Sequence, residues 1–297
     1  MTPKGWAAPD NQAVGVALGT ASGVAFATVA IFAKLGYSKG ASALPLLTGR
    51  FVVATLLLVL FGLGTRRNLR IPRPTANTLV SLGMVALAFE ALLFFAALER
   101  APAAVVGLVF YSYPAWTTLV GFALGLEAIS VRTVLALVLG SAGVVTVFSL
   151  PDGGSTGLWF ALAAALVVAA YLPVAQRVTR DVDPYAGAVW TAIGASAALL
   201  GASAVTTSTV PLRATPELLA LGFATAIAYV LLYRALGLIG SARASIAMMV
   251  EPVATLVLAA IVLDESITPR VAFGATLVVA ALLLLATQRR RAVVAEV

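Results

Sequence analysis

Two stretches of the chain share one unusual pattern: "SYPAWTTLVGFALGLE" at 112–127 and "VEPVATLVLAAIVLDE" at 250–265. Each reads as an apolar helix that has a proline near its middle and an acidic residue at its end. Pro114 precedes Glu127 by thirteen residues, and Pro252 precedes Glu265 by thirteen residues. The repeated spacing predicts that the chain consists of two related halves.

The composition places these helices in a membrane. Of the 297 residues, 61% are hydrophobic and 10% are charged, and the mean hydropathy is +1.04. Soluble domains carry about 25% charged residues, so a soluble fold would have too little polar surface here. The chain has no cysteine and no histidine, which excludes disulfides, thiol chemistry and the commonest metal ligand and proton carrier. We expect neither a cofactor nor a metal.

Hydropathy predicts the number of spans. About 20 apolar residues cross the roughly 30 Å of a bilayer core. The first such segment is longer than the roughly 7–15 apolar residues of a signal peptide, and we expect it to remain as a membrane helix. The predicted spans are 13–35, 43–64, 76–98, 103–125, 131–149, 156–178, 186–208, 217–237, 243–263 and 269–288.

The basic residues orient these ten spans. They lie in short loops between apolar segments, so the net charge of +7 does not indicate nucleic-acid binding. With the N-terminus in the cytoplasm, the inner segments hold twelve Lys and Arg residues and the outer segments hold five. Cytoplasmic loops favour Lys and Arg. The expected fold class is therefore an all-α integral membrane protein with ten transmembrane helices and both termini cytoplasmic.

The two halves align at an offset of 138 residues. This offset matches Ala97-Leu98 with Ala235-Leu236, Ala104 with Ala242, Thr117 with Thr255, and Arg132 with Arg270. The repeats are 13–149 and 156–288, with five helices in each. Because five is odd, the repeats must insert with opposite orientation, a plan found in secondary transporters whose substrate site lies between the halves. Glu127 then faces the cytoplasm and Glu265 faces outside.

The order of several short motifs resembles a known family. They are "FAK" at 32–34 with Pro45, "GRF" at 49–51, "YP" at 113–114 with "LE" at 126–127, and "EP" at 251–252 with "DE" at 264–265. Together they resemble the drug/metabolite transporter superfamily and its ten-helix EamA-type members. The resemblance covers nearly the whole chain as two EamA-like units. The second half departs from the first, because Gln176 or Arg177 stands near where Lys34 would recur and no arginine matches Arg50.

Within that superfamily the chain is similar to the YddG-like amino-acid exporters. This resemblance implies export of amino acids or related metabolites across the bacterial inner membrane. The superfamily also carries sugars, nucleotide-sugars, vitamins and drugs, so the motifs leave the substrate class open. The implied partners are a small-molecule substrate and the lipid bilayer. Two halves of five helices can enclose a cavity without a second chain, and we expect a monomer.

Charged residues within apolar spans are the first candidates for the substrate site, because each costs about 2.5–3.5 kcal/mol to insert. Glu251 could bind a cation, a proton or a substrate ammonium, or it could pair with Arg234 or Arg50. Glu90 could be a proton site or bond to a neighbouring helix. Arg50 could bind a substrate carboxylate, or it could extend to the interface. Lys34 could line the cavity or contact headgroups at the outer interface.

Aromatic residues form the second candidate set. A cavity lined by tyrosines would suit small zwitterions or apolar side chains, and buried tyrosines need hydrogen-bond partners. The small residues of "GTASGVAFA" (19–27) and "GFATAIAY" (222–229) predict close helix packing instead. The tyrosine candidates are Tyr111, Tyr113, Tyr171, Tyr229 and Tyr233.

The repeated prolines and acids are candidates for hinges and gates. Pro114 and Pro252 could act as paired hinges or as static kinks, and Glu127 and Glu265 place a charge at each mouth. The leading interpretation is a secondary transporter with alternating access. A membrane enzyme is disfavoured by the lack of His, Cys or a Ser/Lys dyad in a helix. A channel or a structural subunit remains as the alternative, although two halves favour a carrier over a pore built from repeated subunits.

Overall fold

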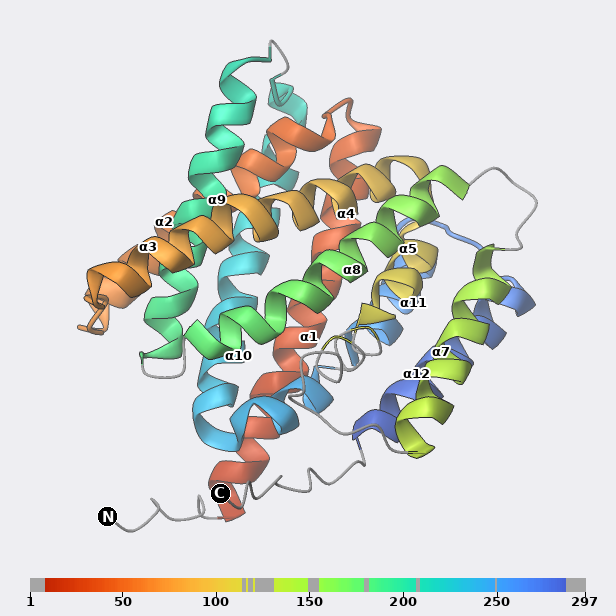
Figure 1. The fold of residues 1–297 in the computed structure, drawn as a ribbon. Helices are drawn as coiled ribbons and strands as arrows, with labels where there is room; N and C mark the ends of the chain where they lie inside the picture. The colour runs from red at the N-terminus through yellow and green to blue at the C-terminus, as the bar shows by residue number, and fades with distance from the viewer. Residues whose placement is uncertain are drawn as a thin grey trace.

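The computed structural model describes residues 9–113, 116, 120, 131–148, 155–178, 182–206, 209–248 and 250–286. Over these residues the chain is helical and contains no β-strand (Figure 1). The first half contributes α1 (Pro9–Ser38), α2 (Ala43–Gly64), α3 (Arg73–Leu82), the π-helix η1 (Gly83–Leu87), α4 (Ala88–Arg100), α5 (Ala103–Phe110) and α7 (Val131–Phe148). The second half contributes α8 (Ser155–Val178), α9 (Pro184–Ala204), the 3-10 helix η2 (Leu212–Ala214), α10 (Thr215–Ala247), α11 (Val250–Val262) and α12 (Pro269–Ala286).

Several helices are long and apolar enough to cross a membrane, which confirms the predicted all-helical membrane class. Among the described residues, five qualify by length and composition, and shorter apolar helices accompany them. The predicted span 43–64 coincides with α2. The five are Ala13–Ser38, Ala43–Gly64, Arg73–Arg100, Tyr185–Ala204 and Leu212–Leu232, and the shorter ones are Thr156–Tyr171, Val250–Val262 and Pro269–Ala281.

The packing of the helices relates the two halves. Helix α1 packs against α10, and its counterpart α8 packs against α4. Helix α2 also contacts α10, and its counterpart α9 contacts α3 and η1. The last helices of the two halves, α7 and α12, lie side by side at one edge of the molecule (Figure 1). Exchanging the halves therefore reproduces the same helix pairs, as expected for two structural repeats.

The structure differs from the predicted loop between the eighth and ninth spans. Residues 238–242 are helical, and α10 continues to Ala247 before a turn at Met248. The first half has its break at the matching place, since α5 ends at Phe110 and 110 plus the offset of 138 is 248. Each half therefore contains an interrupted helix, as transporters often do around their substrate site.

The interruption corrects the predicted position of Pro252 within its helix. Pro252 is the third residue of α11 rather than a mid-helix residue. In the first turn of a helix the missing N–H of proline has no intrahelical partner to lose, so Pro252 does not itself kink α11. The discontinuity lies at Met248, whose carbonyl accepts a 2.9 Å hydrogen bond from Glu251 N. Pro114 lies outside the described residues.

The third predicted span contains a one-residue insertion relative to its repeat. Leu82-Gly83 matches Leu221-Gly222 at an offset of 139, whereas Ala97-Leu98 matches Ala235-Leu236 at 138. The extra residue lies where η1 interrupts the α-helix, and Ala88 N there donates to Gly83 O, five residues earlier. A π-turn accommodates one additional residue in this way and often marks a functional site. Glu90 follows directly as the third residue of α4.

Gly23 of α1 allows close packing against the break between α10 and α11. A Cβ at Gly23 would lie 2.8 Å from Val250 Cγ1 and 2.9 Å from the Met248 carbonyl oxygen. Because backbone cannot move aside, Gly23→Ala should destabilise the protein by about 1–3 kcal/mol, as overpacking does. The melting temperature in detergent should fall.

Gly201→Ala is the matched control, because a Cβ at Gly201 in α9 would meet no atom within 4 Å. It should leave the melting temperature unchanged or raise it slightly, since alanine favours a helix over glycine. Equal melting temperatures for the two variants would contradict the packing argument.

Candidate functional site

Charged and tyrosine side chains from both halves converge in the interior. Arg50 on α2 lies close enough to interact electrostatically with Glu90 on α4 and with Glu251 at the start of α11. Glu90 and Glu251 also interact with each other. We call this set, together with its tyrosines, the central cluster: Arg50, Glu90, Tyr111, Tyr113, Tyr171, Tyr229 and Glu251.

Arg50 is almost fully buried, with 8% of its surface exposed. Its Nε donates a 2.9 Å hydrogen bond to Thr225 Oγ1 on α10. Its guanidinium carbon lies 5.2 Å from the Phe51 ring centroid and 5.4 Å from that of Phe95, within the range of cation–π attraction. The two terminal nitrogens make no hydrogen bond to the residues that the structure describes. The planar donor pair of the guanidinium is thus held in place, and no residue in the described part of the chain accepts a hydrogen bond from it.

The two carboxylates are near Arg50 without forming ion pairs. Within the described part of the chain, neither Glu90 nor Glu251 has a lysine or arginine nitrogen within 4.0 Å. The predicted alternative, in which Glu251 pairs with Arg234 or Arg50, is therefore wrong for this conformation. The Tyr111 hydroxyl is the hydrogen-bonding neighbour of Glu251.

The four tyrosines of the cluster come from three different segments of the chain. Tyr111 and Tyr113 lie at the break after α5, with ring centroids 5.7 Å apart. Tyr171 on α8 is a hydrogen-bonding neighbour of Thr191 on α9. Tyr229 on α10 packs edge-on against Phe26 of α1, at 5.4 Å between centroids. The cluster therefore joins helices of both repeats.

Not every predicted site residue lies in the central cluster. Lys34 is half-buried and its electrostatic neighbour is Glu265, at one end of the helix bundle. The side chain of Tyr233 and the whole of Pro114 and Glu127 lie outside the part of the protein that the structure describes.

Glu265 binds the N-terminus of a helix in the other repeat. Its two carboxylate oxygens accept hydrogen bonds from Ala103 N at 2.7 Å and Ala104 N at 3.1 Å, the first two residues of α5. These N–H groups have no intrahelical partner, and the helix dipole favours a negative charge there. Glu265 thereby ties the segment after α11 to the start of α5.

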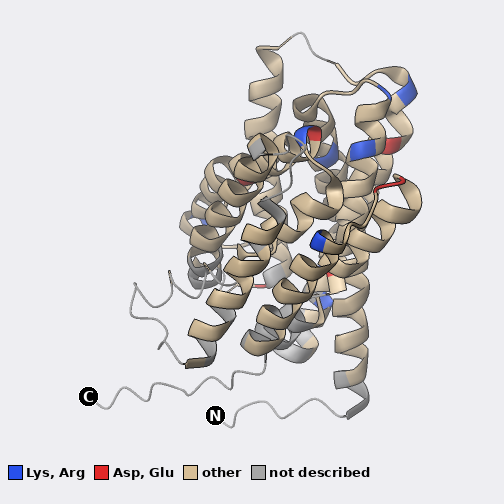
Figure 2. Ribbon diagram, turned by 90° about the vertical axis from the view of Figure 1, so that its right-hand side faces the viewer, with Lys and Arg blue, Asp and Glu red and all other residues tan. Residues whose placement is uncertain are grey.

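Further contacts close the same end of the bundle, which we call the Lys39 end. Lys39 forms an ion pair of 2.5 Å with Glu217 at the start of α10, and Arg213 Nε donates to the Lys39 carbonyl at 2.6 Å. Glu99 accepts from Ala43 N, the first residue of α2, at 2.7 Å. In Figure 2 many of the charged ribbon segments gather toward one end of the bundle.

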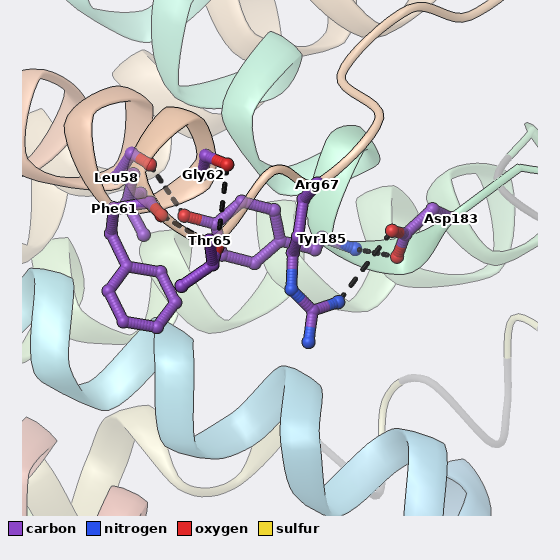
Figure 3. Close-up of polar contacts among 7 residues, drawn as sticks. All are labelled: Leu58, Phe61, Gly62, Thr65, Arg67, Asp183 and Tyr185. Atoms are coloured by element: carbon purple, nitrogen blue, oxygen red, sulfur yellow. Dashed lines mark hydrogen bonds and ion pairs between the residues drawn. The ribbon is translucent and has the colours of Figure 1, made fainter.

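The opposite end is linked through α2 and α9. Tyr185 donates from its hydroxyl to the Leu58 carbonyl at 2.5 Å, and Arg67 lies 3.7 Å from the Asp183 carboxylate (Figure 3). Asp183 also caps α9 by accepting from Tyr185 N. We call this the Arg67 end. It joins the C-terminus of a first-repeat helix to the N-terminus of its second-repeat counterpart.

The sequence did not single out Thr225, Phe51 and Phe95 as part of the site. Thr225 lies in "GFATAIAY", which predicted only close packing of small residues. Its hydroxyl is fully buried and bonded to Arg50. A signal was present, because a hydroxyl in an apolar helix needs a partner and Arg50 was the buried donor in need of one.

Comparisons with known proteins agree with this architecture. The chain matches the EamA-like transporter family over residues 13–149 and again over residues 155–287. A solved structure described as "Crystal structure of protein" aligns with a TM-score of 0.63 at 19% identity, covering 89% of this chain and 96% of that chain. That level of identity supports the fold alone. No curated protein matches the chain. With two matched repeats that together span most of its length, the chain belongs to the EamA-like transporter family of the drug/metabolite transporter superfamily.

Proposed function

We propose that this transporter exports amino acids or related small metabolites across the bacterial inner membrane by alternating access. In this proposal the chain acts as a monomer with ten transmembrane helices, its two repeats are inverted, and both termini are cytoplasmic. The substrate site is the central cluster. Arg50 binds the substrate carboxylate, and Glu251 or Glu90 binds the substrate ammonium.

One observation carries the proposal. The cluster holds a buried guanidinium and two half-buried carboxylates that come from three helices and form no ion pair with one another within 4.0 Å. Charges are costly in a membrane and normally pair when they serve structure alone. Unpaired charges of both signs in one place suit a zwitterion, whose own charges complete the pairing. The tyrosine rings and hydroxyls suit its remaining surface.

The alternating-access part rests on the paired ends of the bundle. Glu265 acts as the gate residue at the Lys39 end, with Lys34 beside it. Glu127 is its counterpart by the repeat offset. The interrupted helices around Met248 and after Phe110 place backbone breaks beside Glu251 and Tyr111, where a change of helix angle alters access to the cluster. Pro252 lies in the first turn of α11, which follows the break at Met248, and Pro114 is its counterpart by the repeat offset.

Counterflow in proteoliposomes tests the proposal. Vesicles are loaded with one unlabelled amino acid at a time, and entry of the same labelled compound is followed with and without a pH gradient. Saturable entry stimulated by internal substrate for a subset of amino acids is the expected result, because a carrier exchanges its substrate. A linear, non-exchanging flux would indicate a channel instead. Counterflow with sugars, nucleosides or drugs but with no amino acid would retain the carrier and reject the amino-acid assignment.

A further inference from the structure

A threonine on α10 fixes the direction in which the Arg50 guanidinium points. Thr225 Oγ1 accepts the 2.9 Å hydrogen bond from Arg50 Nε and itself donates to the Leu221 carbonyl at 2.8 Å. Thr225 is fully buried. The hydroxyl is therefore used both as a donor and as an acceptor: its proton points at the helix backbone and a lone pair points at Arg50.

Gly222 brings α10 close enough for this contact. A Cβ at Gly222 would meet the side chain of Val53 and would lie 3.3 Å from the Arg50 carbonyl oxygen. Without a side chain there, α10 packs directly on the α2 backbone. Thr225 lies three residues further on and therefore on the same face of α10. The glycine and the threonine act together, one permitting the approach and the other using it.

The orientation of the guanidinium is then determined on two sides. The Nε–H bond to Thr225 fixes one edge of the planar group, and the rings of Phe51 and Phe95 lie 5.2 and 5.4 Å from its carbon. The remaining edge carries the two terminal nitrogens, which bond to no described residue. The charged and polar neighbours of the group are Tyr37, Glu90, Tyr229 and Glu251.

We propose that Thr225 is a positioning residue that holds Arg50 ready for bidentate binding of a substrate carboxylate. This inference rests on the proposed function and narrows it to substrates that carry a carboxylate close to a cationic group. A guanidinium fork matches the two oxygens of a carboxylate, whereas a sugar hydroxyl does not use both donors in this way. Glu90 and Glu251 receive the cationic group.

Two substitutions of Thr225 separate orientation from packing. Thr225→Val keeps the shape and removes the hydroxyl, and Thr225→Ser keeps the hydroxyl and removes the methyl group. In counterflow, Thr225→Val should raise KM for amino acids roughly tenfold, as the loss of one hydrogen bond to a charged group predicts, with little change in maximal rate. Thr225→Ser should remain within about twofold of the wild type.

Amines that lack the carboxylate provide the decisive readout. The primary amine corresponding to each transported amino acid is added as a competitor, and its inhibition constant is measured in each variant. Thr225→Val should leave the amine constants unchanged, because an amine does not use Arg50. Thr48→Val is the structural control, since Thr48 is a buried threonine of α2 that bonds to Leu44 and Ser203 away from Arg50. It should change stability without changing the ratio of amino acid to amine affinity.

Each outcome decides the question. Equal KM values in Thr225→Val and Thr225→Ser, or an equal loss of affinity for amines, would overturn the positioning role. Absence of counterflow with every amino acid would reject the proposed function instead. In that case the melting temperature of the purified protein is measured with the same amino acids and amines. A rise in melting temperature that amino acids cause and amines do not, that is lost in Thr225→Val and that is kept in Thr225→Ser, supports the inference. If amino acids do not raise the melting temperature of the wild type in this way, the inference is overturned.

Discussion

Replacing Arg50 with lysine should lower amino-acid uptake at sub-saturating concentration by roughly a hundredfold. Lysine keeps the charge but lacks the planar donor pair, and it cannot reproduce the bond from Nε to Thr225. A hydrogen bond to a charged group contributes about 1.5–3 kcal/mol net, and lysine keeps one such bond to the carboxylate. A net loss of about 2.8 kcal/mol corresponds to a hundredfold change in affinity. The effect should appear in KM, with initial counterflow rates as the measurement.

Arg70→Lys is the matched control for this substitution. Arg70 is exposed in the connection between α2 and α3, where its backbone N–H bonds to Asn68. It should transport as the wild type does. Similar melting temperatures for the Arg50 and Arg70 variants would show that both are folded. If folded Arg50→Lys protein kept the wild-type KM, Arg50 would be a structural charge and the central cluster would not bind carboxylates through it.

The sequence predicted most of the charged part of the central cluster. Arg50, Glu90 and Glu251 stand out because a charge within an apolar span requires a reason. The structure brings all three together. Lys34 satisfied the same rule, yet its neighbour is Glu265, because it lies in the last turns of α1 at the Lys39 end. Hydropathy shows that a charged residue lies within a span. It does not show how deep in the membrane, or on which face of the helix, the charged end of the side chain lies.

The orientation of these charges could not be predicted. Thr225 contacts Arg50 across 175 residues of sequence, and the contact depends on how closely Gly222 lets α10 approach α2. The sequence pattern of either helix alone predicts neither the contact between Arg50 and Thr225 nor the distance between α10 and α2. The alternative pairing of Glu251 with Arg50 or Arg234 was also compatible with the sequence, and the three-dimensional separation of the side chains decided against it.

The observed helix limits show which of the spans predicted from hydropathy are right and which are wrong. The predicted span at 43–64 coincides with α2, whose ends are bounded by polar and glycine residues. The predicted spans left a loop at 238–242, but the helix continues through it, Gly240 included. In a bilayer an interrupted helix leaves backbone groups without partners, so glycine alone does not end a helix. The break occurs at Met248, where the turn is stabilised by the bond from Glu251 N.

Helices α2 and α9 link the two repeats along their length. Thr48 bonds to Ser203 at 2.8 Å, Thr55 bonds to Ser196 at 3.0 Å, and Tyr185 bonds to the Leu58 carbonyl. Bonds at the middle and toward both ends hold this pair together. We therefore expect that opening of the Lys39 end leaves α2 and α9 paired and separates α5 from the segment that follows α11, where Glu265 forms the connection.

Replacing Glu265 with glutamine should open the Lys39 end more often, by roughly thirtyfold. Glutamine keeps the size of the side chain but loses the charge and one of the two acceptor oxygens. The N–H groups of Ala103 and Ala104 then lose a charge-assisted cap, and caps and helix-dipole interactions together contribute about 2 kcal/mol. A free-energy change of about 2 kcal/mol corresponds to roughly thirtyfold in an equilibrium constant.

Cysteine labelling measures this opening directly, because the chain contains no cysteine. Ser112→Cys introduces a thiol at the break after α5, where Ser112 is 8% exposed and lies beside the central cluster. A charged, membrane-impermeant thiol reagent is applied to the Lys39 end of right-side-out vesicles, and the labelling rate reports the open fraction. The rate should rise about thirtyfold in the Glu265→Gln background, as the free-energy argument requires.

Asp264→Asn is the control, because Asp264 is exposed beside Glu265 and makes no ion pair with the residues that the structure describes. Its φ of 52° is also tolerated by asparagine, so the local turn should be kept. The control removes one negative charge from the same end without removing the cap on α5. A labelling rate that rises equally in both variants would assign the effect to surface charge attracting the reagent. A rise confined to Glu265→Gln would establish that a carboxylate of one repeat, bound to a helix N-terminus of the other, controls access to the central cluster from this end.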